Sequence, residues 1–300
     1  MKEKIEKWKE ETDSILLAHY YVPKEIQELA DYVGDSFYLA SLSKKVRQKQ
    51  IVMAGVYFMG ESIKILNPEK KVIMLHESAD CPMAHMIQKE KIQEMREQYD
   101  DLAVVCYINS TAEIKALSDV CVTSSNAVSI VKQLSEKNIF FIPDGNLARY
   151  VASFVPEKNM IPNDGYCPVH HQITREELLE WKQKYPQAKI VSHPECQQDI
   201  LSLSDFVGST KQIIQKIKEY KGKEYIIVTE MGIAHELKRS SPDKKFYFLP
   251  SLSCQDMKYS TLEAFSKLLQ NPLKEIILEK GTIEMAKKSL QRMLELMEGQ

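Results

Sequence analysis

The stretch Leu-Ser-Asp-Phe-Val-Gly-Ser-Thr at residues 203–210 decides the fold, because two closely similar stretches occur earlier in the chain. Residues 29–36 read LADYVGDS and residues 117–125 read LSDVCVTSS, so the copies recur at a period of about 87 residues. In each copy a leucine is followed two residues later by an aspartate and seven residues later by a hydroxyl side chain. An amphipathic helix pattern begins after each hydroxyl. The chain therefore consists of three copies of one unit.

Each unit shows alternating strand and helix patterns. Apolar runs typical of buried parallel strands precede each copy of the stretch, and two further runs follow it before the next copy. The unit is thus strand–helix–strand–helix–strand–helix, which predicts an α/β fold of three similar small three-layer α/β/α domains with parallel sheets around a pseudo-threefold axis. We place these domains at residues 1–84, 85–170 and 171–300. The last includes a C-terminal helix, whose apolar stripe we expect to pack on the third domain, with closure of the site as the alternative.

Polar side chains end the first strand of every unit at matched positions. The strand ends carry His19, Tyr107 and His193, and two residues further on stand Tyr21, Asn109 and Glu195. Ligands of open parallel sheets bind outside the carboxyl ends of the strands, so these groups are expected to converge on one cavity. The repeated hydroxyls at helix starts would face the same cavity, where free backbone N–H groups favour a carboxylate or phosphate; they are Ser36, Ser124 and Thr210. Simple helix capping is the alternative explanation for any one of these hydroxyls.

Three of the six cysteines also fall in register. Cys81, Cys167 and Cys254 lie at the same place in each unit within about a residue, after the last strand pattern. Three thiolates brought together from distant segments suit a metal better than disulfides, and either a zinc ion or a [4Fe–4S] cluster with one exchangeable iron position fits them. The remaining cysteines are expected in the core or, for the last, just beyond a strand end: Cys106, Cys121 and Cys196.

Composition narrows the classes of function. The chain has 300 residues, 44% hydrophobic and 27% charged, with a net charge of −2, so nothing points to a nucleic acid or a membrane surface as partner. No apolar run reaches the roughly 18–20 residues of a membrane-spanning helix. The first eight residues, MKEKIEKW, read as a charged helix start rather than a signal peptide. We therefore expect a cytoplasmic protein that acts on small molecules.

Several short motifs, taken in order, resemble the quinolinate synthase family. They are HYY at 19–21, YVGDS at 32–36, YINST at 107–111, TSSNAV at 123–128, CPVH at 167–170, HPEC at 193–196 and GST at 208–210. The resemblance implies three α/β domains around a pseudo-threefold axis. It also implies condensation of iminoaspartate with dihydroxyacetone phosphate to quinolinate, phosphate and two waters, in NAD biosynthesis. A functional link to an aspartate oxidase or dehydrogenase would supply the iminoaspartate.

The same resemblance assigns residue roles. One [4Fe–4S] cluster per chain would be held by Cys81, Cys167 and Cys254, with its open iron facing the substrate. Proton transfers would fall to Tyr21, with His19 and Glu195. The residues that would hold carboxylates, phosphate or the growing ring are Ser36, Tyr107, Asn109, Ser124, His170, His193 and Thr210.

Two departures and two rivals accompany the resemblance. Tyr20 stands where the family often has asparagine, and its side chain is expected to point away from Tyr21. Ser251 and Phe248 stand where some members have two extra cysteines, so the disulfide of those members cannot form in this chain. A three-cysteine radical enzyme of the diphthamide type would need room for S-adenosylmethionine. A zinc-bound or metal-free protein that binds small dicarboxylates is the alternative from another class.

Overall fold

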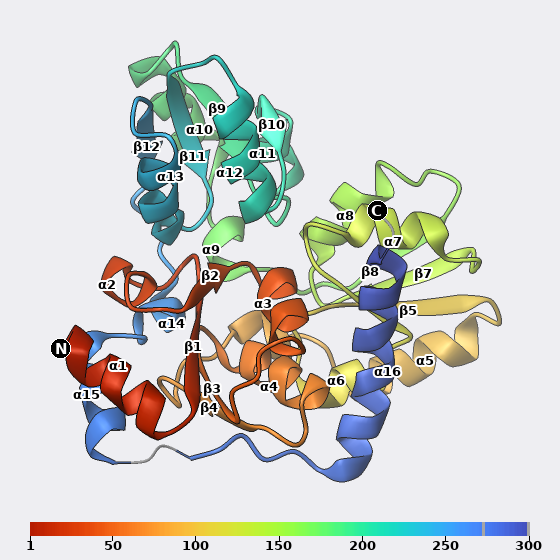
Figure 1. Cartoon of the computed structure of the whole chain (residues 1–300). Helices are drawn as coiled ribbons and strands as arrows, with labels where there is room; N and C mark the ends of the chain where they lie inside the picture. The colour runs from red at the N-terminus through yellow and green to blue at the C-terminus, as the bar shows by residue number, and fades with distance from the viewer. Residues whose placement is uncertain (272–273, 299–300) are drawn as a thin grey trace.

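The computed structural model describes residues 1–271 and 274–298, and its strands form three separate parallel sheets (Figure 1). Each sheet has four strands, in the orders β2-β1-β3-β4, β6-β5-β7-β8 and β10-β9-β11-β12. This arrangement confirms the α/β class and is consistent with three similar α/β/α domains. The exact limits assigned to the three domains stay a prediction. Within the described ranges, no helix is both long and apolar enough to cross a membrane.

The first unit extends from the N-terminus to the first of the repeat-matched cysteines. Its elements are α1 (Lys2–Glu11), β1 (Ser14–His19), α2 (Lys24–Gln27), β2 (Tyr32–Gly34), α3 (Ser36–Ser43), β3 (Gln50–Ala54), α4 (Tyr57–Leu66), β4 (Lys71–Met74) and the 3₁₀ turn η1 (Pro82–His85). The second unit repeats this order with α5 (Lys89–Gln98), β5 (Leu102–Tyr107), α6 (Ala112–Ala116), β6 (Val120–Val122), α7 (Ala127–Gln133), β7 (Asn138–Ile142), α8 (Gly145–Ala152), β8 (Asn159–Pro162) and α9 (Pro168–His171).

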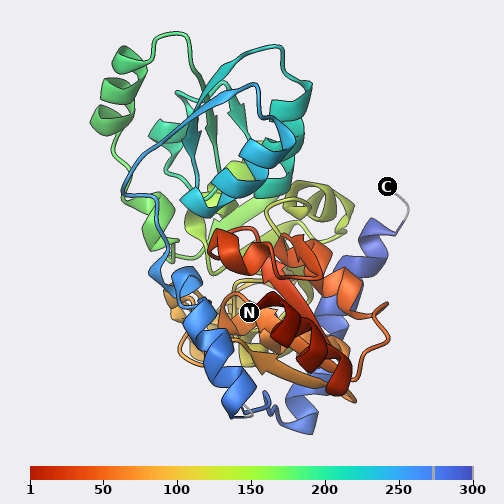
Figure 2. The same ribbon diagram turned by 60° about the vertical axis from the view of Figure 1, so that its left-hand side comes forward.

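The third unit lies at the top of both views, above the other two (Figures 1 and 2). It contains α10 (Arg175–Lys184), β9 (Lys189–Ser192), α11 (Gln198–Leu201), β10 (Phe206–Val207), α12 (Thr210–Glu219), β11 (Glu224–Val228), η2 (Met231–Ile233), α13 (Ala234–Ser240), β12 (Lys245–Phe248) and α14 (Gln255–Lys258). Part of its interior forms a hydrophobic cluster of its own, whereas the rest, including Val191, Ile213 and Tyr225, belongs to the large core shared with the first two units.

The repeated stretch forms a strand that the sequence pattern did not predict. Its middle residues become the short edge strand β2, β6 or β10, so each sheet has four strands where three were expected. The repeated aspartate explains this edge. Asp31 accepts a hydrogen bond from the backbone N–H of Leu16 at 2.8 Å, and its own N–H donates to the Leu16 carbonyl at 2.9 Å. Asp119 makes the same pair of bonds to Val104 in the second unit. The aspartate therefore fastens the edge strand to the first strand.

The two C-terminal helices return to the beginning of the fold. Helix α15 (Leu262–Gln270) lies against α1, where the rings of Phe265 and Trp8 meet edge to face with centroids 6.0 Å apart. Helix α16 (Lys280–Met297) packs on α6, β6 and α4 (Figure 1). The prediction that the C-terminal helix packs on the third domain is therefore wrong. An apolar stripe requires a partner surface but does not specify which one.

Candidate active site

The ends of the first strands meet at a small cavity of about 60 Å³, here called the inner cavity. All three units contribute to its wall, as expected from the carboxyl ends of their parallel strands. Nine of the residues singled out in the sequence line it: His19, Tyr21, Ser36, Tyr107, Asn109, Ser124, His193, Glu195 and Thr210. The repeat therefore brings together side chains that are far apart in the chain.

The hydroxyls around the inner cavity are not the helix caps that the alternative explanation required. Asp35 caps α3 by accepting the N–H of Tyr38 at 2.8 Å, and Ser209 caps α12 through a capping box with Gln212. Ser36 and Thr210 are instead the first residues of these helices. Ser124 lies further out, before the cap of α7, and its hydroxyl is 3.2 Å from Nε2 of His193. All three hydroxyls are thus available to the cavity rather than spent on capping.

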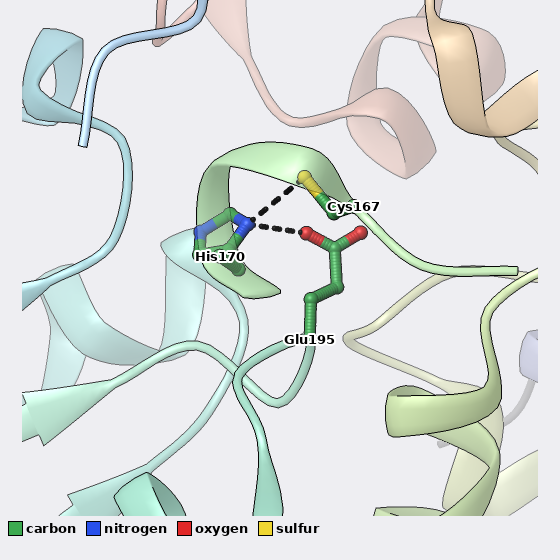
Figure 3. A group of neighbouring side chains, drawn as sticks. All are labelled: Cys167, His170 and Glu195. Atoms are coloured by element: carbon green, nitrogen blue, oxygen red, sulfur yellow. Dashed lines mark hydrogen bonds and ion pairs between the residues drawn. The ribbon is translucent and has the colours of Figure 1, made fainter. Parts of the chain in front are cut away.

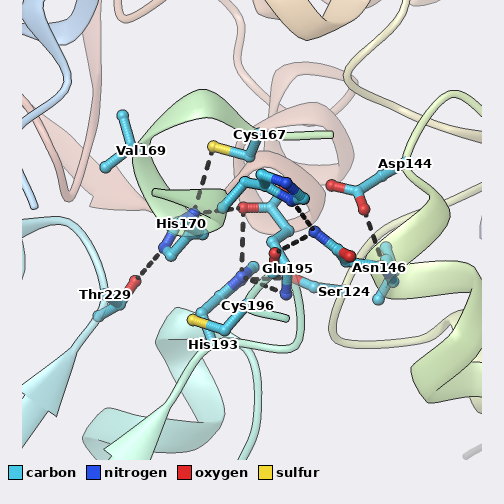
Figure 4. Close-up of polar contacts among 12 residues, drawn as sticks. Ser124, Asp144, Asn146, Cys167, Val169, His170, His193, Glu195, Cys196 and Thr229 are labelled. Atoms are coloured by element: carbon cyan, nitrogen blue, oxygen red, sulfur yellow. Dashed lines mark hydrogen bonds and ion pairs between the residues drawn. The ribbon is translucent and has the colours of Figure 1, made fainter. Parts of the chain in front are cut away.

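A buried chain of hydrogen bonds runs from Glu195 through His170 to Thr229 (Figure 4) and continues to Tyr21. The carboxylate Oε2 of Glu195 lies 2.8 Å from Nδ1 of His170 and 3.2 Å from Nδ1 of His193. The other ring nitrogen of His170 lies 3.0 Å from the hydroxyl of Thr229. That hydroxyl is 2.9 Å from the hydroxyl of Tyr21, which also lies 2.5 Å from Thr210. A carboxylate, an imidazole and a phenol are therefore connected through Thr229.

Burial and neighbouring charges give the groups at the two ends of this hydrogen-bonded chain different proton affinities. Burial alone would raise the pKa of Glu195, but the imidazoles of His193 and His170 outweigh it and hold the pKa well below the usual range. Burial raises the pKa of Tyr21, and burial together with Glu195 raises that of Tyr107. Burial lowers the pKa of His19 to about 3. At neutral pH the site therefore combines a carboxylate with protonated phenols and a neutral imidazole.

A second cavity of about 310 Å³, here called the cysteine cavity, adjoins the first. Cys81, Cys167 and Cys254 all line it, and all three are free thiols. The two cavities share five wall residues: Tyr21, Phe58, Asn109, Glu195 and Met257. A group bound between the three sulfurs would therefore face the polar groups of the inner cavity.

The surroundings of the three sulfurs suit a negatively charged metal–thiolate group. Each cysteine stands immediately before a short helical turn, η1, α9 or α14, whose first N–H groups face the sulfur. Burial nevertheless raises the pKa of every one of these thiols, to about 11 for Cys254, because the charge of a bare thiolate is not compensated. A metal centre would supply that compensation. The other cysteines are fully buried, which agrees with the expected core positions of Cys106 and Cys121.

Cys167 also takes part in a smaller group of candidate ligands (Figure 3). Its sulfur lies 3.3 Å from Nδ1 of His170, and one ligand atom each from Cys167, His170 and Glu195 lies within 4.8 Å of the others. The end of the polar chain therefore reaches the cysteine cavity through a direct contact.

Comparison with known proteins agrees with this geometry. The sequence profile of the family described as "Quinolinate synthetase A protein" matches residues 3–295. The quinolinate synthase of Fusobacterium nucleatum is 56% identical over 296 residues, covering 99% of each chain. That of Caldicellulosiruptor saccharolyticus is 47% identical, over 99% of this chain and 98% of its own. That of Clostridioides difficile is 48% identical, over 98% and 97%. The chain belongs to the quinolinate synthase family. It is thus a member of a family of enzymes of NAD biosynthesis.

The positions matched to the family from sequence lie where the two cavities meet. Besides the nine residues of the inner cavity and the three cysteines, His170 lines the cysteine cavity. Tyr20 lines a different, outer groove together with residues such as Gln27 and Arg239, in keeping with its expected direction away from Tyr21. The role of each residue in this family member stays a prediction.

Sequence reasoning missed Thr229 and Asn146. Thr229 follows β11 directly, as Gly55 follows β3 and Pro143 follows β7, so the ends of the middle strands carried a signal that was not used. Asn146, in the first turn of α8, donates from Nδ2 to the backbone carbonyl of Glu195 at 3.1 Å (Figure 4). It holds the carboxylate-bearing loop in place from the neighbouring unit.

Proposed function

We propose that this chain condenses iminoaspartate with dihydroxyacetone phosphate, giving quinolinate, phosphate and two waters. One observation carries the proposal: three free cysteines, one from each unit, open onto a cavity that shares a wall with the polar inner cavity. The family relationship supplies the reaction, and this arrangement supports it. The iminoaspartate would come from an aspartate oxidase or dehydrogenase acting on aspartate.

The residues that would hold a [4Fe–4S] cluster are Cys81, Cys167 and Cys254. Three cysteine ligands leave one iron without a protein ligand, and when bound this iron supplies Lewis acidity toward a substrate oxygen. Backbone N–H groups facing each sulfur favour the negative charge of such a cluster. The size of the cysteine cavity, about 310 Å³, and its partial exposure leave room for the cluster beside the substrate.

The chain's own residues would divide the proton transfers between them. Tyr21 keeps its proton at neutral pH because burial raises its pKa, so its hydroxyl is suited to donate. Glu195 stays ionised, and with its low pKa it would orient His170 rather than retain a proton, while His170 and Thr229 form the hydrogen-bonded path to Tyr21. His19 stays neutral, and its Nδ1 accepts the N–H of Tyr21 at 3.2 Å, which fixes the turn that carries the tyrosine.

Substrate binding would use the remaining polar groups of the inner cavity. The hydroxyls of Ser36 and Thr210 stand at helix starts, where backbone N–H groups attract the carboxylates and the phosphate. Ser124 and His193 would act as a hydrogen-bonded pair on the same wall. Tyr107 and Asn109 would position the growing ring. Both substrates carry negative charge, which suits this concentration of donors.

Anaerobic purification followed by a quinolinate assay tests the proposal. We expect a brown protein with iron and sulfide bound, which forms quinolinate from iminoaspartate and dihydroxyacetone phosphate. Tyr21→Phe should abolish turnover while the iron and sulfide content stays that of the wild type. A colourless protein with stoichiometric zinc that binds dicarboxylates without turning them over would refute the proposal. Full activity of Tyr21→Phe would refute the role of the tyrosine alone.

A further inference from the structure

A buried ion pair lies outside the polar chain, at the contact between the first and third units. Glu230 is 1% exposed and follows β11, directly after Thr229. Its carboxylate lies 2.7 Å from Nζ of Lys258, on α14. The same carboxylate accepts the backbone N–H of Cys254 at 3.2 Å and that of Gly232 at 2.6 Å. One side chain thus binds the segment that carries a cysteine of the cysteine cavity.

Lys258 extends this pair into the first unit. Its ammonium group donates to the backbone carbonyl of Tyr21 at 2.6 Å, in addition to its contact with Glu230. Lys258 therefore connects the backbone of Tyr21 to a carboxylate that also holds the backbone of Cys254. A charged donor to a carbonyl in a partly buried site is among the stronger hydrogen bonds in proteins.

The backbone of Tyr21 packs tightly against the segment that contains Gly232. A Cβ atom added to Gly232 would lie 2.5 Å from the carbonyl oxygen of Tyr21 and 2.6 Å from its Cα, so the two backbones are in direct contact. Gln27 donates to the carbonyls of Val22 and Gly232, which ties the turn after Tyr21 to the same segment. A change in the position of the Lys258 ammonium would therefore be transmitted to Tyr21.

The second unit shows what this pair adds. Asp144 follows β7 as Glu230 follows β11, and it likewise accepts a hydrogen bond from the backbone of its unit's cysteine, Cys167. The second oxygen of Asp144 has no hydrogen-bond partner among the described residues. The second and third units thus each have a carboxylate beside their cysteine. The lysine that contacts Tyr21 occurs in the third unit.

We propose that Glu230 and Lys258 are positioning residues that fix Tyr21 relative to the Cys254 segment. The proposal rests on the role of Tyr21 given under the proposed function. In this arrangement Lys258 acts on turnover through Tyr21, whereas the cysteine keeps its place through the carboxylate and the N–H groups of α14. Removing the lysine should therefore lower turnover without lowering the iron and sulfide content of the reconstituted protein.

The test compares Lys258→Met, Lys258→Arg and Glu230→Gln with the wild type, all reconstituted with iron and sulfide. Lys258→Met should retain wild-type iron and sulfide but lose at least about tenfold in kcat, as expected for a small misplacement of a reacting group. Lys258→Arg should recover to within a few-fold of the wild type. The double variant Glu230→Gln/Lys258→Met should lose no more than the worse single variant, because the pair acts as a unit.

Lys238→Met is the matched control, because Lys238 is exposed and lines, together with Lys258, a second surface groove beside Val22 and Pro23. It should keep wild-type kcat and melting temperature. The rate at which a chelator removes iron gives a readout that does not depend on turnover, and it should be unchanged in Lys258→Met. Wild-type kcat in Lys258→Met, or loss of iron in step with loss of activity, would overturn the proposal. A wild type that forms no quinolinate would instead refute the proposed function.

Discussion

Replacement of Thr229 by valine is the sharpest test of the buried polar chain. Valine keeps the branched shape of threonine but lacks the hydroxyl that lies 2.9 Å from Tyr21 and 3.0 Å from His170. Tyr21 retains its contact with Thr210 at 2.5 Å, so the group left without a partner is the second ring nitrogen of His170. A buried polar group without a partner costs about 1–3 kcal/mol of folding free energy.

The same free-energy cost, if it falls on the transition state, predicts the decrease in kcat/KM. If the connection is needed during turnover, about 1–3 kcal/mol corresponds to roughly a 5- to 150-fold decrease in kcat/KM. The assay is quinolinate formation by anaerobically reconstituted protein, with iron and sulfide measured on the same sample. Neither Thr229 nor the two groups it bonds is one of the three cysteines, so the metal content should equal that of the wild type.

Thr174→Val provides the matched control. Thr174 is exposed, lines neither cavity and caps α10 by accepting the N–H of Glu177 at 3.2 Å, so loss of its hydroxyl costs about 1 kcal/mol of stability. The control should unfold at lower urea concentration yet turn over normally. Wild-type kcat/KM in Thr229→Val would refute the reasoning, and so would an equal kinetic loss in both variants, because the effect would then follow stability alone.

Three further predictions concern the metal ligands, the backbone contact between Gly232 and Tyr21, and the effect of pH. Replacing any one of Cys81, Cys167 and Cys254 by alanine should sharply reduce iron and sulfide after reconstitution. Cys121→Ala should change only stability, and equal metal loss in that variant would contradict the assignment. Gly232→Ala should lower activity, because its Cβ would lie 2.5 Å from the backbone of Tyr21. Gly281→Ala is the control and should be neutral or slightly stabilising, because no atom lies within 4 Å of the added Cβ. Equal loss of activity in the two variants would argue against a contact with Tyr21. Burial lowers the pKa of His19 to about 3, so only the unfolded chain gains this proton as the pH falls below about 6.5. The stability from neutral His19 is complete above that pH and declines toward pH 3. His19→Gln should therefore lose stability less steeply between pH 6.5 and 5 in urea unfolding, by up to about 1.4 kcal/mol per pH unit, and equal slopes would show that the ring titrates normally.

The repeat period of the sequence predicted the three-unit fold, and the matched positions within the repeats predicted most of the site. The repeat placed His19, Tyr107 and His193 at equivalent strand ends, and the carboxyl ends of parallel strands meet at one place. The short edge strands were missed because β10 has only two residues, too few for any alternation of apolar and polar side chains to show. The aspartates that fasten these strands were visible as a repeat, but their bonds to backbone N–H groups depend on the neighbouring strand.

Other features depended on how the units pack against one another. Thr229 became part of the site because the third unit presents it to Tyr21 of the first, which no pattern within one unit could indicate. Lys258 illustrates the same limit, since its partners Glu230 and Tyr21 belong to different units. The apolar stripe of α16 predicted burial correctly, but the hydrophobic effect is non-directional and did not choose the surface.

The return of α15 and α16 to the first two units has a consequence for the newly made chain. Until the ribosome has released residues 262–297, α1 lacks the ring of Phe265 and β6 lacks the cover of α16, whose Ser289 contacts Cys121. The first two units thus leave the exit tunnel with apolar surfaces still open, although they are synthesised first. The third unit depends less on these two helices, because part of its interior forms a separate hydrophobic cluster and the rest joins the shared core. The order of synthesis and the order of completion therefore differ in this protein, and a ribosome that stops near residue 260 should release a chain prone to aggregation.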